Sequence, residues 1–172
     1  IMIPQQYQST FTWLSQQTTH GVQGVAILES GHPGPTVGLT VMTHGNEPSG
    51  LAAVQRAREL VLKQRLLKGR IICIITNLKA ATAYANDTSG NTLQYRFIHH
   101  NMNRLPADVM QQTENLPYEF QRAQQLQPFW KQFNLAFDVH STHTPAPAML
   151  VEIQGNVSHL THGMPLPVII RN

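Results

Sequence analysis

A short strand-like run that ends in a His-x-x-Glu sequence is the feature that most constrains what this chain can fold into. Apolar residues alternate with smaller ones over residues 37–41, as in a buried strand, and polar residues follow at once. His44 and Glu47 lie in this exit, and Pro48 suits the first turn of a helix, where its missing N–H costs nothing. Ligands gather at the carboxyl ends of strands in open α/β sheets. The stretch 36–50 therefore predicts a strand, a candidate cation site and a helix, in that order.

The segments that follow predict a βαβ unit. An amphipathic helix is expected over residues 51–68 with Gly69 as its stop, and the run at 70–76 is apolar enough for a central strand covered on both faces. Residues 77–104 break the pattern, with a polar loop at 86–91, as functional or mobile loops do. The other expected elements are helices at 11–17 and from Pro117 to Trp130, with Pro128 a candidate kink, and strands at 22–28, 135–139, 148–153 and 168–170.

Length and charge favour one globular domain. The 172 residues suffice for one sizeable core, which we expect to span residues 1–172. The 12 basic and 9 acidic residues give a net charge of +3 without a run of like charge, so we expect no nucleic acid and no membrane surface as partner.

Cysteine content and the chain ends bear on the compartment. Cys73 is the single cysteine and lies in an apolar run, so it is expected to be a buried hydrophobe. The chain shows neither a signal peptide nor an apolar run of about 20 residues, which predicts a cytoplasmic protein. Because it opens on Ile1 and stops at Asn172 just after a strand-like run, we expect it to be part of something longer.

A second strand, at 135–139, also ends in potential metal ligands. Asp138 and His140 are two residues apart and therefore face the same side of that strand. Together with His44 and Glu47, His140 completes a set of two imidazoles and one carboxylate, which with a fourth position for water is the ligand set of a catalytic zinc site. Asp138 would accept the other N–H of a ligand imidazole and fix its tautomer. Structural zinc would need four protein ligands, usually with cysteines.

Three ordered motifs carry a family resemblance. They are HGNE at 44–47, RFIHHNMNR at 96–104 and DVHST at 138–142. Together they resemble the aspartoacylase and succinylglutamate desuccinylase family, whose members are relatives of the zinc carboxypeptidases. The resemblance covers roughly residues 37–142. It implies a three-layer α/β/α sandwich with a mixed, mostly parallel sheet, and one zinc ion per chain.

The resemblance also implies roles for individual residues. It places zinc on His44, Glu47 and His140. It implies that the substrate's carboxylate is held by Arg96, Asn103 and Arg104. The chemistry of these side chains agrees independently, because a guanidinium fork is shaped for bidentate recognition of a carboxylate.

The sequence departs from the family pattern in three places. The family commonly has Asp-Leu-Asn-Arg where this chain has Asn at position 101, so an amide replaces a carboxylate that would orient the loop, and substrate preference is expected to differ. The family's general base is a glutamate expected beyond Asn172; Glu152, the only carboxylate after His140, comes too soon and sits in an ordinary strand pattern. The segment from Asn77 to Arg96 is longer than the family pattern, which predicts an insertion.

Each assignment has an alternative. His44 and Glu47 could cap a helix, and the arginines could be ordinary solvated residues. His143 would replace His140 as ligand if residues 138–143 formed a turn. One of His99 and His100 is expected to be packed or exposed rather than ligating, because adjacent residues of an extended segment face opposite sides. The remaining histidines are expected at the surface: His20, His32, His159 and His162.

The resulting hypothesis is a zinc-dependent hydrolase that cleaves the amide bond of an N-acyl amino acid or a small peptide-like substrate bearing a carboxylate. Zinc and the glutamate beyond the chain would activate water, and an arginine would stabilise the oxyanion. Two alternatives remain open at this point. One is a zinc carboxypeptidase that acts on peptides, and the other is a non-catalytic carboxylate-binding module on the same scaffold.

Overall fold

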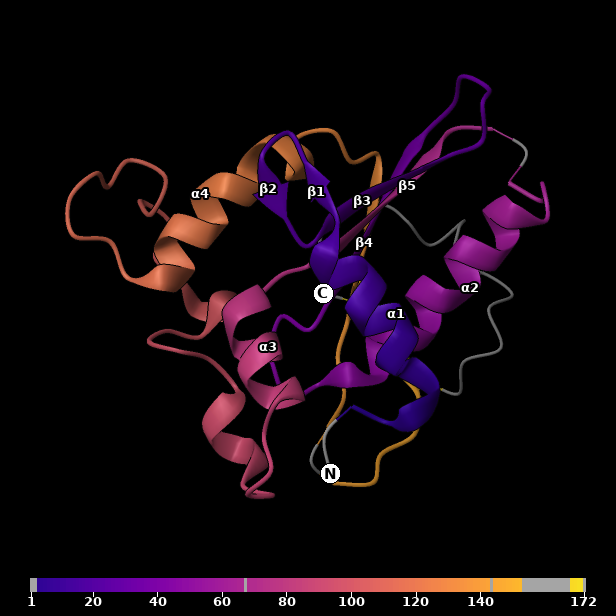
Figure 1. The fold of residues 1–172 in the computed structure, drawn as a ribbon. Coiled ribbons are helices and arrows are strands. Elements are labelled where there is room, and N and C mark those ends of the chain that lie inside the picture. The colour runs from indigo at the N-terminus through magenta and orange to yellow at the C-terminus, as the bar shows by residue number, and fades with distance from the viewer. Residues whose placement is uncertain (1–2, 67, 143, 153–167, 172) are drawn as a thin grey trace. The chain divides into compact units, whose positions relative to one another are not determined.

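A four-stranded mixed sheet forms the centre of the first part of the chain (Figure 1). Its strand order is β3-β5-β4-β6, in which β3 is antiparallel to β5 and the other neighbours are parallel. The bounds are Val25–Glu29 for β3, Thr36–Val41 for β4, Arg70–Ile75 for β5 and Leu135–Val139 for β6. The predicted mixed, mostly parallel sheet is confirmed.

The computed structural model describes residues 3–66, 68–142, 144–152 and 168–171. The chain divides into two units, Ile1–Ser141 and Thr142–Asn172. The second unit contains β7 (Met149–Glu152) and β8 (Val168–Arg171), which pair in parallel, so both strands predicted there are present. A single domain over all 172 residues stays a prediction.

The predicted βαβ unit is present as β4, α2 and β5. A 3₁₀ turn, η1 (Pro48–Gly50), leads from the strand exit into α2 (Leu51–Leu62). The helix ends earlier than residue 68 because Gln64 adopts a left-handed φ of 52°. The N–H of Arg65 then donates to Leu60 O and that of Gln64 to Val61 O, which is the Schellman arrangement. The left-handed conformation of Gln64 therefore ends the helix, rather than Gly69 as predicted.

Other predicted elements differ in extent. Helix α1 (Gln5–Gln16) is longer than the predicted 11–17 and starts directly after Pro4. The predicted strand 22–28 is broken at Gly24, whose φ is 77°, into β2 (Val22–Gln23) and β3. Strand β2 pairs instead with β1 (Thr18–Thr19).

The stretch read as irregular contains a helix that the sequence analysis missed. Helix α3 (Leu78–Ala85) begins at Asn77, whose side-chain oxygen accepts a hydrogen bond from the Ala80 N–H. The loop beyond it includes two 3₁₀ turns, η2 (Thr92–Tyr95) and η3 (Met102–Arg104). Eight residues carry too few apolar repeats for a helical period to stand out, so only the Asn77 cap marked this helix in the sequence.

Helices cover both faces of the sheet. Strand β5 alternates: Cys73 and Ile75 pack into a core shared with α1 and α2, whereas Ile72 and Ile74 pack on the opposite face against α4 (Tyr118–Trp130). Burying each such side chain stabilises the fold by roughly 1.5–3 kcal/mol. The two cores confirm the predicted three-layer sandwich, and α4 continues through Pro128 to its end at Trp130.

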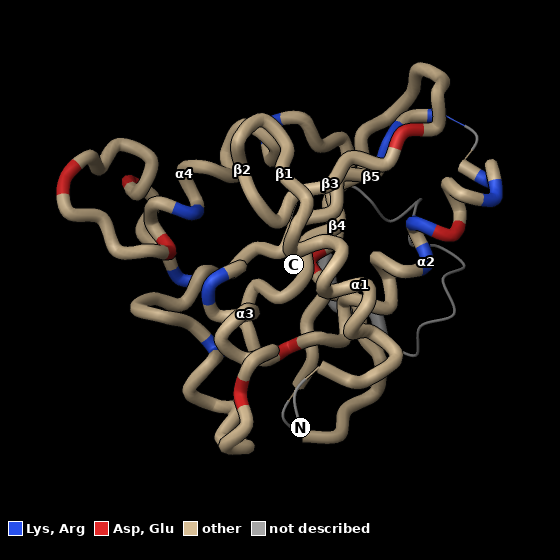
Figure 2. The backbone as a smooth tube through the Cα atoms, viewed as in Figure 1, with Lys and Arg blue, Asp and Glu red and all other residues tan. Residues whose placement is uncertain are grey.

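Charges are interleaved rather than gathered. Helix α2 (Figure 2) carries a single acidic residue, Glu59, which forms an exposed ion pair of 2.9 Å with Arg56. Among the helices in the described residues, none has the length and apolar character that a membrane crossing requires.

The packing of α4 yields a stability prediction. Leu126→Ala is expected to lower the free energy of unfolding by about 2–5 kcal/mol, because Leu126 is 0% exposed in the core against β5. Leu62→Ala removes the same atoms from a side chain that is 78% exposed, and is expected to stay within about 0.5 kcal/mol of wild type. Urea unfolding followed by circular dichroism measures both, and equal losses would contradict the assignment of α4 to the core.

Candidate metal centre

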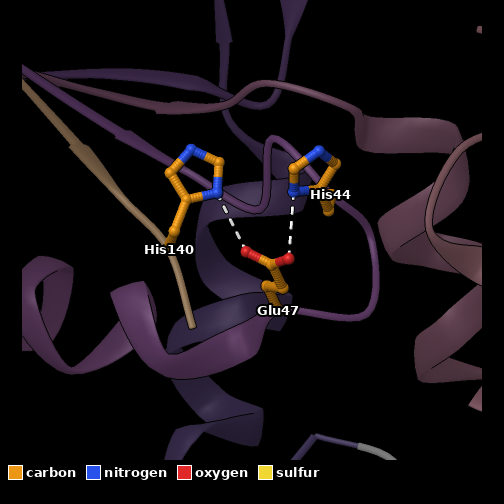
Figure 3. Close-up of side chains that lie close together, drawn as sticks. All are labelled: His44, Glu47 and His140. Atoms are coloured by element: carbon orange, nitrogen blue, oxygen red, sulfur yellow. Dashed lines mark hydrogen bonds and ion pairs between the residues drawn. The ribbon is translucent and has the colours of Figure 1, made fainter. Parts of the chain in front are cut away.

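Two imidazoles converge on one buried carboxylate at the carboxyl edge of the sheet (Figure 3). His44 Nδ1 lies 3.0 Å from Glu47 Oε1, and His140 Nδ1 lies 2.9 Å from Glu47 Oε2. The two rings are 5.0 Å apart between centroids. One potential ligand atom from each residue lies within 4.8 Å of the other two. The structure thus brings together the three residues predicted to bind zinc.

The ends of two neighbouring strands create this arrangement. Strands β4 and β6 are parallel and in register, with Thr40 opposite Asp138, so the chain leaves both strands at the same edge. After β4, buried Met42 takes a left-handed φ of 51°, which turns the chain before His44. Such backbone conformations are costly for non-glycine residues and recur at functional sites. The exits that looked alike in sequence are therefore adjacent in space.

Glu47 receives four polar contacts. Besides the two imidazoles, the guanidinium of Arg96 donates to Oε1 at 2.7 Å and the backbone N–H of Ser141 donates to Oε2 at 3.1 Å. The side chain is 4% exposed. Burial alone would raise the pKa of Glu47, but the hydrogen bonds from His140, His44 and Ser141 outweigh it and hold the pKa well below its usual range. Glu47 is therefore a carboxylate at neutral pH.

Asp138 contacts His140, the imidazole that it is predicted to orient. Its Oδ2 lies 2.7 Å from His140 Nε2, and the hydroxyls of Thr40 and Thr43 donate to Oδ1 at 2.8 and 2.7 Å. The hydrogen bonds to Asp138 and Glu47 raise the pKa of His140 to about 9. Burial would raise the pKa of Asp138, but its bond from His140 and those from the threonines lower it. The ionised carboxylate accepts the Nε2 proton, which leaves Nδ1 to face Glu47.

Asn101 plays the same part for His44. Its side-chain oxygen accepts the backbone N–H of Asn103 at 2.9 Å and lies 3.0 Å from His44 Nε2. Because a backbone N–H only donates, the atom it faces must be the amide oxygen. His44 Nε2–H therefore donates to Asn101, and His44 Nδ1 is the ring nitrogen that faces Glu47. The amide at position 101, predicted to affect the loop, thus contacts a candidate metal ligand directly.

Arg96 is held in place by its backbone as well as its side chain. Its carbonyl accepts the N–H of Gly45 at 3.1 Å. A Cβ at Gly45 would lie 2.6 Å from the carbonyl oxygen of Tyr95, so only glycine permits this close approach. Predicted to bind substrate, Arg96 lies against Glu47 with its side chain 32% exposed.

The other two predicted substrate residues lie on the outer side of the cluster. The Asn103 side-chain nitrogen is 3.2 Å from His140 Nε2. Arg104 is exposed, and its guanidinium donates to Asn103 O at 3.4 Å. Within the part of the chain that the structure describes, no acidic side chain pairs with Arg104, so its guanidinium is available to an anion.

The remaining histidines do not join the cluster among the described residues. His99 Nδ1 is 3.7 Å from Glu119, and His100 packs on the Phe120 ring at 5.0 Å. His20 and His32 are exposed as predicted. The rival ligand His143 lies outside the described residues, as do His159 and His162. Glu152 ends β7 of the second unit, in the strand predicted for it.

Three residues that support the site were not predicted from the sequence. Thr40 and Thr43 hold Asp138, and Glu119 holds the loop before Asn101 through backbone N–H groups. The threonines carried a weak signal, since they flank a strand exit. Glu119 carried none, because an acid in the first turn of a helix is ordinary.

The donor set fits a divalent cation such as zinc. Both imidazoles present Nδ1, each has its Nε2 held by an oxygen acceptor, and the third donor is an ionised carboxylate. Two nitrogen ligands and one oxygen ligand, each oriented by a hydrogen-bonded partner, are what catalytic zinc sites use.

Fold and cluster together define a class: α/β proteins with a two-histidine, one-glutamate cluster at the carboxyl edge of a mostly parallel sheet. The model of the succinylglutamate desuccinylase/aspartoacylase catalytic domain matches residues 33–162. The chain belongs to this family. The matched range includes the three clustered residues and the loop that carries Arg96 and Arg104.

A solved structure shows the same fold. The succinylglutamate desuccinylase from Chromobacterium violaceum superposes with a TM-score of 0.54 and 21% sequence identity, over 78% of this chain. The chain spans 44% of that protein's length. No curated protein sequence matches the chain.

The role of Asn101 is testable through metal affinity. Asn101→Ala is expected to weaken zinc binding about 10–100-fold, because the Nε2 proton of His44 loses its acceptor. Asn101→Asp keeps an acceptor and adds charge, so it is expected to bind zinc at least as tightly as wild type. Competition with a chromophoric chelator measures both, and an Asn101→Ala affinity equal to wild type would show that this contact does not orient His44.

Proposed function

We propose that this chain carries the metal-binding part of a zinc-dependent hydrolase that cleaves the amide bond of an N-acyl amino acid or a small peptide-like substrate. One observation carries the proposal: Nδ1 of His44, Nδ1 of His140 and the Glu47 carboxylate converge. They do so in a member of the succinylglutamate desuccinylase/aspartoacylase family. Desuccinylases and aspartoacylases both remove acyl groups from amino acids, so an N-acyl amino acid is the substrate class that this membership favours.

His44, Glu47 and His140 would hold the ion. Bound zinc lowers the pKa of a water molecule to roughly 7 and polarises a carbonyl group. The residues around the cluster orient its ligands: Asp138 and Asn101 accept the outer N–H groups of the two imidazoles. Positioned in this way, each ring keeps one tautomer and one direction.

Arg96 supplies positive charge beside the reacting bond. Its guanidinium lies 2.7 Å from Glu47 Oε1, and its backbone is fixed by Gly45, so the charge is in place before substrate arrives. Preorganised charge of this kind stabilises an oxyanion without reorganisation. Under the proposal, Arg96 also helps to hold the carboxylate of the substrate.

Asn103 and Arg104 would bind the substrate's carboxylate on the outer side of the cluster. A cleft of about 450 Å³ is lined by Asn103 and Asp138, which is a volume suited to a small molecule. Thr76 lines the same cleft, and its buried hydroxyl has no hydrogen-bond partner within the described residues. The cleft borders the cluster through Asp138, and its lining also includes apolar side chains such as Trp130 and Phe133.

Two parts of the hypothesis stay predictions. The glutamate that acts as general base is still expected beyond Asn172, and the cytoplasm is still the expected compartment.

A carboxypeptidase or a non-catalytic module would use the same cluster. Release of a C-terminal residue from peptides would favour the first, and carboxylate binding without turnover would favour the second.

Metal content tests the cluster directly. About one zinc per chain is expected in the wild-type protein and loss of it in His44→Ala and His140→Ala, because each removes one of three ligands. His32→Ala, at an exposed histidine, is the control and should keep its zinc. Elemental analysis of the purified proteins provides the measurement, and wild type that stays metal-free after incubation with zinc would refute the proposal.

Arg104→Ala tests substrate recognition in the full-length protein. The kcat/KM for an N-acyl amino acid such as N-succinylglutamate is expected to fall about 10–100-fold, since a hydrogen bond between charged groups is worth about 1.5–3 kcal/mol. The loss should appear mainly in KM and should vanish for an amide without the carboxylate. Exposed Arg65→Ala is the matched control. An unchanged kcat/KM in Arg104→Ala would rule this role out.

A further inference from the structure

A second buried carboxylate lies outside the metal cluster and has no part in the proposed chemistry. Glu119 is in the first turn of α4 and is 0% exposed. Burying a carboxylate is costly unless its oxygens are hydrogen-bonded or paired with a cation. The question is therefore what balances this charge.

Successive backbone N–H groups balance it. The N–H of Ile98 donates to Glu119 Oε1 at 2.7 Å, that of His99 to Oε2 at 3.1 Å and that of His100 to Oε2 at 3.2 Å. The side-chain amide of Asn77 adds a fourth donor, to Oε1 at 3.1 Å. Three consecutive N–H groups that point at one anion form a nest, and here the anion is supplied by the chain itself.

No arginine or lysine among the described residues takes this role. Arg122, one turn further along α4, is also buried, but it donates to the carbonyl oxygens of Ile75 and Thr76. Burial would raise the pKa of Glu119, yet the bonds from Ile98, Asn77 and His100 lower it. The carboxylate is thus bound mainly by the N–H groups of the loop, and His99 Nδ1 lies 3.7 Å from Oε2.

The segment held in this way connects two contacts of the metal cluster. Arg96, two residues before the nest, binds Glu47, and Asn101, directly after it, accepts the Nε2 proton of His44. Asn101 in turn binds the N–H of Asn103. A shift of residues 98–100 would therefore move the partner of His44 and the guanidinium beside Glu47 together.

We propose that Glu119 is a positioning residue, which fixes the loop 96–104 so that Asn101 and Arg96 orient the metal ligands. The inference rests on the proposed function, because it assigns Glu119 a purpose through that metal centre. Glu119 touches none of the reacting groups and acts only through the loop.

Glu119→Gln is the sharpest test. The side chain keeps its shape, but one acceptor oxygen becomes an NH₂ group that faces N–H donors, so the nest loses part of its binding. Zinc affinity is expected to fall about tenfold, in line with the loss of other groups that orient ligands. Amide hydrogen exchange at residues 98–100 should become faster, and the visible spectrum of the Co²⁺-substituted protein should change with the ligand geometry.

Two controls separate positioning from mere stability. Leu126→Ala weakens the same helix at a core position remote from the nest, so it should lower the unfolding free energy while zinc affinity and the Co²⁺ spectrum stay those of wild type. Glu59→Gln removes one carboxylate from the surface of α2 and should change neither. If Glu119→Gln does not fold, Glu119→Asp takes its place, because its shorter side chain withdraws the oxygens from the nest.

The outcomes distinguish this inference from the proposed function. Wild type that binds no zinc would overturn the proposed function and this inference with it. Wild type that binds zinc, with unchanged affinity, spectrum and amide exchange in the Glu119 variant, would overturn the inference alone. A loss of affinity in Leu126→Ala equal to that in the Glu119 variant would likewise overturn it, because general destabilisation would then explain the effect.

Discussion

The buried carboxylate of Glu47 is the constraint on which the rest of the site depends. It is 4% exposed, yet it receives two imidazoles, one guanidinium and one backbone N–H. Those donors come from both strand exits and from the loop that precedes η3, so the charge of one side chain draws together three segments far apart in sequence. A buried anion with this many donors is favourable only when all of them are in place. The same groups that stabilise Glu47 are therefore the ones that shape the cluster.

Each imidazole is oriented from behind by a different kind of acceptor. His140 has a carboxylate, Asp138, whereas His44 has an amide, Asn101. When the outer N–H of an imidazole donates to a carboxylate, the other ring nitrogen binds a metal more strongly than when that N–H donates to an amide. The two ligands are thus unequal, and the weaker arrangement lies on the loop that Glu119 holds. Under the two proposals, this asymmetry would make the metal centre sensitive to Glu119, which does not touch it.

The sequence was most informative where the signal was local. The strands of the sheet and the βαβ crossover could be predicted because apolar alternation is visible within a few residues. The three clustered residues could be singled out because each of them closely follows a strand-like run. The end of α2 could not, because Gln64 adopts a left-handed conformation that its residue type does not advertise. Nor could the role of Glu119, whose partners are backbone N–H groups about 20 residues away, since any sequence supplies those.

The central claim is that a metal ion is held by Nδ1 of His44, Nδ1 of His140 and the carboxylate of Glu47. X-ray absorption at the zinc edge, combined with anomalous diffraction from zinc-loaded crystals, measures this most directly. The account predicts two imidazole nitrogens and at least one carboxylate oxygen at about 2.0–2.2 Å from the ion, with both rings bound through Nδ1. Zinc bound elsewhere, or through Nε2 of either ring, would contradict it.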